Sequence, residues 1–485
     1  MTPPAFAVLL LGSLLAAAPL LPAGMRGLPP ADWEDAGAII GVNTHNPFPM
    51  PEPELDLLQQ AGIRWIRTDV SWSSIETVRG EYNYTRFETF FQQLATRNIG
   101  WISILGDSNL LYGAPQGIGH LGSNATAAQI EGYVSFARDI AQKYSNAGVE
   151  IIWELINEPN TGGGYSDPLH YVAVVLPAGK AIHAANGSVA IGSLANVDVH
   201  PDPETPPPHS DPRAGHSSGF VWLETVLKNG GGTIADYITV HPYRPAAPET
   251  FLPDAGQLER LIAQYSPVDR RPRLSQGEWG YSYCGNGMGN CVAQGTHISA
   301  ETEGKLMVRM YLTSLAGGAR PAIWYDWKSG PTAIGCNCTL APKPPCCGEH
   351  MGMIDDGARP LPSWHGVRTL SAMVSGMVFQ GKLDMCGDTP CPQMGADWAL
   401  GFTNATHTAL TVWSVGSSPH EMELRFAFGQ WEIFDWRGNA LGRAVARAGS
   451  HIKLHSNSSC GDMYAYIDQV EQCAPVYLVQ RREGV

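Results

Sequence analysis

Short apolar runs alternate with longer amphipathic stretches from about residue 38 to about residue 376. Short runs of β-branched and aromatic residues are typical of buried parallel strands, and apolar positions three and four apart predict helices. Eight strand-and-helix units over this length favour an α/β fold, a closed (β/α)8 TIM barrel, over an open doubly wound sheet. The predicted strands are 39–43, 65–70, 101–105, 150–155, 189–193, 237–241, 273–276 and 322–326, and the predicted helices include 53–61, 85–96, 127–144, 257–265 and 303–316.

The pattern changes near residue 376, where short alternating segments bounded by turn residues replace the strand-and-helix units. Alternation of apolar and polar residues predicts strands with one buried face. We therefore expect a (β/α)8 catalytic barrel over 25–376, followed by a small antiparallel β-sandwich over 377–485. The predicted strands of this second domain are 398–403, 409–414, 422–428, 431–434 and 476–479.

Residues 1–24 form an apolar segment that is rich in Leu and Ala and ends in small residues and Pro. This composition predicts a secretory signal peptide, although no Lys or Arg precedes the apolar core. The alternative is an uncleaved membrane anchor, because ~17–25 apolar residues can span a bilayer. A signal peptide implies a secreted protein, found outside the cell or in the lumen of the secretory pathway.

The ten cysteines all lie in the second half of the chain, and their even number favours disulfide bonds in an exported protein. A metal site is the alternative for one cluster of four, but oxidising compartments favour bridges over thiolate ligands. The cluster consists of Cys336, Cys338, Cys346 and Cys347, and the three pairs that lie close in sequence are Cys284 with Cys291, Cys386 with Cys391, and Cys460 with Cys473.

Six Asn-x-Ser/Thr sequons agree with this route, because the motif is the acceptor of N-linked glycans in secreted proteins. Together with the leader and the cysteines they predict a glycoprotein. The sequons begin at Asn83, Asn124, Asn186, Asn337, Asn404 and Asn457.

The charge balance limits the kinds of partner. The 485 residues include 31 Lys and Arg against 45 Asp and Glu, for a net charge of −14 at pH 7. Binding of nucleic acid needs clustered Lys and Arg, so no nucleic-acid partner is expected. No G-x-G-x-x-G motif follows the first predicted strand, which argues against a dinucleotide cofactor. We expect a neutral or weakly charged substrate, no metal and no organic cofactor, and the sequence leaves the oligomeric state open.

Two carboxylates follow predicted strands that lie across the barrel from each other. Glu158 follows the fourth strand, which Pro159 ends, and Glu278 follows the seventh strand between glycines. The carboxyl ends of barrel strands meet at the face where catalysis occurs. Hydrolysis of a glycosidic bond needs two carboxyl groups, one protonated and one ionised. Glu154 is the alternative to Glu158, but we expect it to point into the barrel wall or to form a salt bridge.

These motifs resemble those of the large clan of retaining glycoside hydrolases built on (β/α)8 barrels. In particular, the chain looks like glycoside hydrolase family 39 and its members that cleave bacterial exopolysaccharides, and the resemblance covers nearly the whole mature chain. One departure is Gly277, where family members usually have Thr or another β-branched residue before the nucleophile. The matching motifs are Gly41-Val42-Asn43, Ala61-Gly62-Ile63-Arg64-Trp65-Ile66-Arg67, Asn109-x-x-Tyr112, Trp153-Glu154-x-x-Asn157-Glu158-Pro159, His241-Pro242-Tyr243, Glu278-Trp279-Gly280, Ile323-Trp324-Tyr325-Asp326, Met351-Gly352-Met353-Ile354 and Trp364-His365.

The resemblance implies that Glu158 is the general acid/base and Glu278 the nucleophile of a retaining, double-displacement mechanism. Their carboxyl groups should then lie about 5–5.5 Å apart, whereas ~6.5–9.5 Å would indicate inversion. A general acid that works near neutral pH needs a raised pKa, which burial and a charged neighbour would supply to Glu158.

Three residues are expected to support this pair. Arg67 and Tyr243 match clan residues that hydrogen-bond the nucleophile and keep it ionised. For Arg67 the alternative is a structural ion pair with Asp69. His241 matches the histidine that the clan carries on strand six, although a histidine at a strand end is as often only structural.

Three further residues are expected to contact the sugar. Asn157 would donate to the 2-hydroxyl, unless it only caps the following turn. Trp324 would offer an aromatic face to the apolar side of a sugar ring, with a place in the core as the alternative. Asn109 belongs to the motif that follows the third strand.

Several other readings stay open. A family 5-like endo-β-glucanase or mannanase would share both glutamates, and a carbohydrate-binding barrel without activity would have lost one of them. A metalloprotein would use the cluster of four cysteines to hold zinc. The sugar, its linkage and endo or exo action depend on loops such as 200–217 and 336–347, whose shapes the sequence does not specify.

Overall fold

The computed structural model describes the larger part of the chain. The predicted signal peptide, all ten cysteines and the Pro-rich segment 200–217 lie outside the described residues. The described residues are 35–45, 48–161, 167–195, 197, 219–244, 247–281, 299–329, 351–383, 397–415, 420–424, 429–446, 452–456 and 474–481.

Eight parallel strands form a closed barrel, in which β8 pairs with both β7 and β1. All eight predicted strands are confirmed. The seventh runs on to Trp279, past its predicted end at Gln276, so Glu278 belongs to the strand itself. The strands are β1 (Ile40–Asn43), β2 (Trp65–Ser71), β3 (Gly100–Gly106), β4 (Ile151–Leu155), β5 (Ser188–Ala195), β6 (Tyr237–His241), β7 (Arg273–Trp279) and β8 (Ala322–Trp324).

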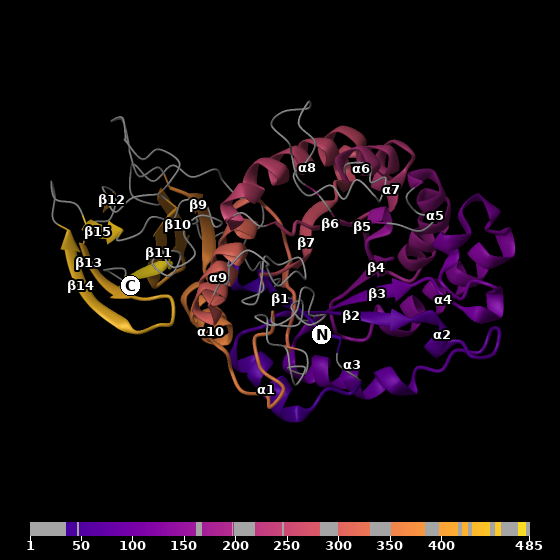
Figure 1. The fold of residues 1–485 in the computed structure, drawn as a ribbon, viewed down its shortest axis with the longest axis horizontal. Coiled ribbons are helices and arrows are strands. Elements are labelled where there is room, and N and C mark those ends of the chain that lie inside the picture. The colour runs from indigo at the N-terminus through magenta and orange to yellow at the C-terminus, as the bar shows by residue number, and fades with distance from the viewer. Residues whose placement is uncertain are drawn as a thin grey trace, which may run out of the picture.

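Helices cover the outside of the barrel, as Figure 1 shows. The five predicted helices are confirmed, with α8 beginning before its predicted start. The sequence supports the start of α4, where Thr126 and Gln129 cap each other's backbone N–H groups. The helices are α1 (Glu52–Gln60), α2 (Trp72–Ile75), α3 (Thr85–Arg97), α4 (Ala127–Tyr144), α5 (Pro168–Ala184), α6 (Gly219–Lys228), α7 (Gly231–Ile234), α8 (Phe251–Tyr265), α9 (Ala300–Ala316) and α10 (Pro362–Val374), with 3-10 turns η1 (Ala36–Ile39), η2 (Leu110–Tyr112), η3 (Ile118–Asn124), η4 (Pro159–Thr161), η6 (Pro248–Thr250) and η7 (Val268–Arg270).

The inside of the barrel changes from apolar to polar along its axis. Side chains two residues apart on a strand face the same side, so Arg67 follows Trp65 into the barrel and Glu154 follows Ile152. The polar layer therefore lies nearer the carboxyl ends of the strands than the apolar layer does. The apolar layer consists of Trp65, Ile102, Ile152, Ala190, Tyr237 and Ile323.

The second domain is an antiparallel β-sandwich, as predicted. One sheet has six strands in the order β14-β13-β16-β11-β10-β9, and the other pairs β12 with β15. Met422 and Leu424 of the small sheet share a core with Leu410 and Val412 of the large one. The strands are β9 (Val378–Lys382), β10 (Asp397–Thr403), β11 (His407–Ser414), β12 (His420–Leu424), β13 (Gly429–Phe434), β14 (Ala440–Ala446), β15 (Ile452–Ser456) and β16 (Val476–Arg481).

The other face of the large sheet packs on the barrel, with α9 and α10 at the junction (Figure 1). The ring of Trp436 lies against Gly304 of α9 and Gly366 of α10, where a Cβ would come within 2.9 Å and 2.8 Å of it. A second contact is made by Trp413, whose indole N–H donates to Glu249 at 2.7 Å. The two domains therefore share one apolar core.

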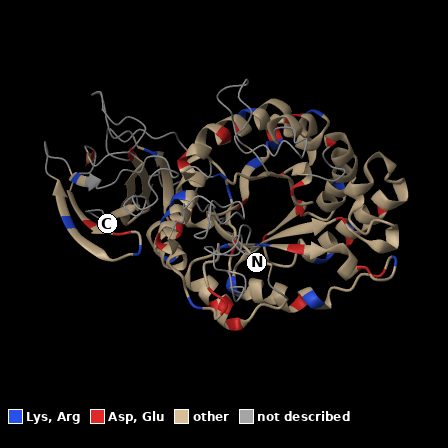
Figure 2. Ribbon diagram, viewed as in Figure 1, with Lys and Arg blue, Asp and Glu red and all other residues tan. Residues whose placement is uncertain are grey.

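Acidic and basic residues are interspersed on the barrel helices (Figure 2). None of the helices in the described part of the chain is long and apolar enough to cross a membrane.

Candidate active site

A strained turn at the end of β4 presents Glu158. Ile156 and Glu158 have φ angles of 68° and 43°, in the left-handed region that costs a non-glycine residue ~1–3 kcal/mol. Neighbouring bonds hold the turn: Thr161 donates to the carbonyl of Glu158, and the side chain of Asn160 bonds both backbone groups of Ala195 on β5. The turn leaves the Glu158 side chain 29% exposed at the mouth of the barrel.

A β-bulge near the end of β7 positions Glu278. Gln276 pairs with Ala322 and Trp279 pairs with Trp324, so two residues of β7 face one residue of β8. Such an extra residue bends a strand and re-aims its side chains. Gly277 occupies the bulge, where a Cβ would lie 3.3 Å from His241 Nε2. The glycine that departs from the family pattern thus leaves room for the histidine of β6.

The two carboxylates meet in one site, together with His241. One ligand atom each of Glu158, His241 and Glu278 lie within 4.8 Å of one another. These three side chains are also the type of donor set that can hold a metal ion. Both oxygens of Glu278 already accept hydrogen bonds, from Arg67 at 2.9 Å and from Tyr243 at 2.7 Å. The two carboxylates are therefore close enough to act on the same reacting atom of a ligand bound between them.

Arg67 connects the site to the wall of the barrel. It is 1% exposed and uses all five of its N–H donors on short bonds. Two go to Glu154, at 3.0 Å and 2.6 Å, and the other three go to Asn43, Glu278 and Asn157 at 3.0, 2.9 and 2.7 Å. The expected hydrogen bond to Glu278 is present, and the alternative ion pair with Asp69 is not among the bonds of Arg67.

Glu154 forms the salt bridge that the sequence analysis expected of it. It is fully buried and bidentate to Arg67. Burial raises the pKa of Glu154, but the charge and the hydrogen bonds of Arg67 outweigh burial and lower it overall. Glu154 therefore stays ionised as the partner of Arg67, and it does not compete with Glu158 for the exposed position.

The pKa of Glu158 is lowered, which corrects the expectation that it is raised. Burial does act to raise it, but the hydrogen bond and charge of His241, followed by the charge of Arg67, outweigh burial. The Nδ1 atom of His241 lies 2.9 Å from Glu158 Oε1. The sequence does not specify the direction of this pKa shift, because the direction depends on which ring nitrogen of His241 lies beside the carboxylate of Glu158.

Asn157 is exposed, and its orientation is set by Arg67. Its Oδ1 accepts from Arg67 at 2.7 Å, so the amide N–H₂ is the group that is left for a ligand.

The structure corrects two expectations about sugar contacts. Trp324 is fully buried, and its indole N–H donates to the carbonyl of Met351 at 2.7 Å, so its ring offers no open face to a sugar. Asn109 is 2% exposed; its side chain donates to Glu76 and caps η2 through the N–H of Leu111. Both residues act as structural groups behind the site.

Ser193 is a site residue that the sequence analysis missed. Its hydroxyl lies 2.7 Å from Glu154 Oε1 and 3.0 Å from His241 Nε2. A bulge in β5 brings it there, with Gly192 at φ 99° and Ser193 at φ 46°. The available signal was its place at the carboxyl end of a predicted barrel strand, directly after a glycine.

A second missed group lies at the rim of the site, on the loop after β1. His45 bonds Asp69 through Nδ1 at 3.0 Å and faces the hydroxyl of Tyr325 through Nε2 at 3.0 Å. The hydrogen bond to Asp69 is the main reason that the pKa of His45 is raised. These residues come from the ends of β1, β2 and β8, so only the closed barrel brings them together.

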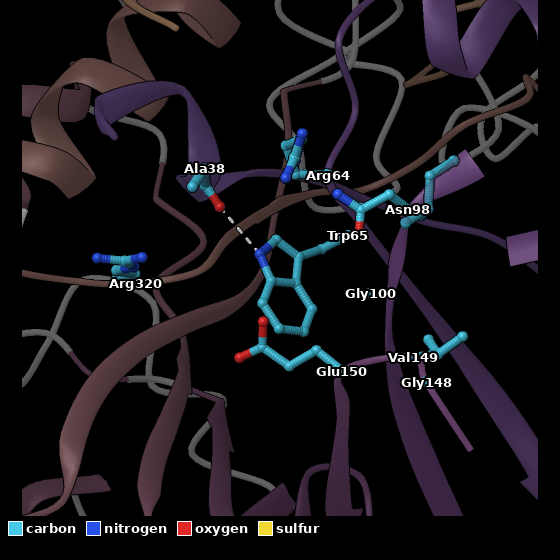
Figure 3. Close-up of a pocket in the computed structure, with 10 residues that line it drawn as sticks. Ala38, Arg64, Trp65, Asn98, Gly100, Gly148, Val149, Glu150 and Arg320 are labelled. Carbon is cyan, nitrogen blue, oxygen red and sulfur yellow. Dashed lines mark hydrogen bonds between the residues drawn. The ribbon is translucent and has the colours of Figure 1, made fainter. Parts of the chain in front are cut away.

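A separate pocket opens at the opposite end of the barrel (Figure 3). Its lining residues precede strands: Arg64 comes before β2, Asn98 before β3 and Glu150 before β4. The indole N–H of Trp65 donates there to the carbonyl of Ala38 at 2.9 Å. This pocket is distinct from the site of Glu158 and Glu278, which lies at the carboxyl ends of the strands. Residues at the amino-terminal end of a barrel usually contribute to stability and not to catalysis.

Comparison with known proteins gives structural matches only, because no protein-family model and no curated protein matches the sequence. A family 39 glycoside hydrolase from Bacteroides cellulosilyticus WH2 has a TM-score of 0.67 at 17% identity, over 92% of this chain and 82% of that one. A family 30 subfamily 8 xylanase from Clostridium acetobutylicum has a TM-score of 0.59 at 10% identity, over 91% and 96%. A glucosidase from Croceicoccus marinus has a TM-score of 0.55 at 12% identity, over 92% and 95%.

These identities are low enough that the likeness concerns the fold. The chain therefore shares the (β/α)8 barrel and following β-domain of these glycoside hydrolases, and it resembles family 39 in its structure as well as in its motifs.

Proposed function

We propose that this protein is a retaining O-glycoside hydrolase that cleaves a β-linked polysaccharide or glycoside. The observation that carries the proposal is the meeting of Glu158 and Glu278, with ligand atoms within 4.8 Å of each other and of His241. Retaining enzymes hold their carboxyl groups about 5–5.5 Å apart, and inverting enzymes need ~6.5–9.5 Å to fit a water. The close approach of the two carboxylates favours retention, and the fold shared with glycoside hydrolases supports hydrolysis of a glycoside.

Glu278 is the nucleophile in this proposal. Arg67 and Tyr243 each donate to one of its oxygens, which stabilises the carboxylate and aims it. Burial and the adjacent Glu278 hold the pKa of Tyr243 well above its usual range, so its hydroxyl remains a donor. In the first step Glu278 bonds to the anomeric carbon while Glu158 gives a proton to the departing oxygen.

Glu158 then acts as the base of the second step. It takes a proton from water, whose oxygen bonds to the anomeric carbon as Glu278 leaves, and both groups return to their first state. Asn157 is placed beside the pair, and its N–H₂ forms no hydrogen bond with the residues that the structure describes, so it is the candidate donor to the sugar 2-hydroxyl. A carbohydrate-binding barrel without activity would have lost one of the two carboxylates. Both are present here, which argues against that alternative.

The central test uses Glu158→Ala and Glu278→Ala. Each should lower turnover by several orders of magnitude with the fold intact, because each removes a group used only in the chemistry. Turnover is measured on a polysaccharide panel, with circular dichroism as the check on folding. Glu131→Ala, on the exposed face of α4, is the control and should match the wild type. Wild-type activity in either test variant would refute the assignment.

Retention has its own measurement. Proton NMR of the first-formed product should show the β-anomer from a β-linked substrate, because double displacement inverts the carbon twice. An α-anomer appearing first would rule out the retaining mechanism while leaving hydrolysis itself in place.

We also propose that the protein is secreted and glycosylated. Asn83, Asn124 and Asn186 are exposed, as acceptor sites must be, and Asn404 is half-buried. The test is expression of the full chain in a eukaryotic cell: the protein should reach the medium, begin near residue 25 and lose mass on enzymatic removal of N-glycans. Retention in the cytosol at full length would contradict the proposal.

A further inference from the structure

The hydrogen bonds around Arg67 determine where the proton of Ser193 lies. The two hydrogens of Arg67 Nη2 point mainly to Glu154 at 2.6 Å and Asn157 at 2.7 Å, so its 3.3 Å contacts with Ser193 and His241 are only the weak branches of shared hydrogens. Glu154 is ionised and can only accept. The Ser193 hydroxyl lies 2.7 Å from Glu154 Oε1 and 3.3 Å from Asn157 Oδ1, and its one hydrogen goes to the nearer oxygen, which is also the charged one.

This leaves Ser193 as an acceptor toward His241. The oxygen of Ser193 lies 3.0 Å from Nε2 of the ring, and with its hydrogen used on Glu154 it has only lone pairs to offer. Nε2 must then carry a hydrogen. On the other side of the ring, Nδ1 faces Glu158 Oε1 at 2.9 Å, with Glu278 Oε2 at 3.7 Å. Between Nδ1 and Glu158 there is room for one proton.

We propose that Ser193 is a positioning residue that holds His241 in the Nε2–H form, so that Nδ1 and Glu158 share the proton that the general acid delivers. The inference rests on the proposed function, whose acid/base is Glu158. The shared proton agrees with the lowered pKa of Glu158, because the Nδ1 atom 2.9 Å from its Oε1 can hold the proton that the carboxyl group gives up.

The transfer balances over one turnover. When a sugar displaces water, the neutral pair is favoured over the charged one, and the proton moves from Nδ1 to Glu158. Glu158 gives it to the departing oxygen as Glu278 bonds to the anomeric carbon. In the second step water supplies one proton to Glu158, which restores the pair. Without the acceptor at Ser193, Nε2 would turn its lone pair toward Arg67, and the hydrogen would stay on Nδ1.

The first test reads the ring directly. Histidine labelled with ¹⁵N gives well separated signals for protonated and unprotonated ring nitrogens, and His241→Gln assigns the signals of His241. In the wild type, Nε2 should carry a hydrogen. In Ser193→Gly the ring of His241 should change to the Nδ1–H form, in which Nε2 carries no hydrogen. Glycine suits the φ of 46° at this position, so the change removes the hydroxyl without straining the backbone. An unprotonated Nε2 in the wild type, or an unchanged ring in Ser193→Gly, would overturn the proposal.

The second test reads the acid step. On phenyl β-D-glucoside or β-D-xyloside, Ser193→Gly should lower kcat/KM about 10- to 100-fold, because the phenolate needs the proton to leave. On the matching 2,4-dinitrophenyl glycoside it should change little, because that group leaves without a proton. Equal losses on both substrates would indicate a merely structural role and refute the proposal.

Ser275→Ala is the matched control. It removes another buried barrel hydroxyl, that of Ser275 on β7, which donates to the carbonyl of Pro321 at 3.0 Å. This variant should leave the ratio of kcat/KM on the two substrates unchanged. The two proposals fail in different ways. A wild type that hydrolyses no glycoside counts against the hydrolase, while the ¹⁵N spectrum still decides the form of His241.

Discussion

A single buried guanidinium organises the charged side chains at the residue scale. Arg67 bonds the fully buried Glu154 and the partly exposed Glu278, and it also sets the orientation of Asn157. A buried charge without a partner is costly, so each of these groups depends on the others for its place. The nucleophile is thereby held by the same residue that fills the polar layer of the barrel.

A pH dependence follows from the rim pair of His45 and Asp69. The hydrogen bond to Asp69 raises the pKa of His45 above its ordinary value of ~6.5. Because the folded pKa is the higher one, protonated His45 stabilises the fold below about pH 6.5, and this contribution is lost as the pH rises through the folded value. Asp69→Asn should lower the pKa of His45. An NMR titration of His45, assigned with His45→Gln, measures the midpoint.

The exposure of this pair, 50% for His45 and 56% for Asp69, keeps its effect on stability small. The midpoint is therefore a sharper measure than the free energy of unfolding. A titration of His45 that is the same in Asp69→Asn and in the wild type would contradict the assigned cause.

Two bulges shape the site at the scale of the strands. Each adds one residue to a barrel strand near its carboxyl end, at Gly192–Ser193 in β5 and at Gly277–Glu278 in β7. In both, a glycine precedes the polar residue that enters the site. The bulges let the ends of β5 and β7, which lie on either side of β6, contribute side chains that an even register would direct elsewhere.

Gly192→Ala tests the bulge in β5. The φ of 99° disfavours a side chain, and a Cβ there would lie 2.9 Å from the carbonyl oxygen of Thr239. We expect a loss of about 1–3 kcal/mol in the free energy of unfolding, measured by urea denaturation. Gly106→Ala at the end of β3 is the control, because its Cβ would meet Val70 at an ordinary 3.6 Å. Equal stabilities of the two variants would count against a strained bulge.

The contact between the domains matters at the scale of the whole molecule. Trp436 fills a slot over two helix glycines, and Trp413 reaches Glu249, which also forms a buried bidentate pair with Arg309 of α9. The β-sandwich thus covers apolar helix surface that the barrel would otherwise expose.

Trp436→Ala should lower the free energy of unfolding by about 3–5 kcal/mol, because it removes a large buried ring and leaves a cavity between the domains. Calorimetry should show a lower melting temperature. Arg443→Ala is the control within the sandwich: its pair with Glu432 is exposed and contributes only ~0–1 kcal/mol. A Trp436→Ala protein that melts like the wild type would show that the domains are not coupled through this ring.

The sequence by itself determined the local elements and the identity of the two carboxylates. Strand and helix periods depend on neighbours in the chain, so the eight barrel strands and the sandwich were predictable, and Pro159 marked the end of the strand before Glu158. The position of Glu278 across the barrel followed from counting strands.

The tertiary structure alone decided how these residues act. Ser193 meets Glu154 across 39 positions of the chain and His241 across 48, through a bulge that no local pattern encodes. The lowered pKa of Glu158 and the burial of Trp324 likewise depend on partners that only the closed barrel supplies. Periodicity specifies which side of a strand a residue faces, whereas hydrogen bonds, charge and burial depend on what lies opposite.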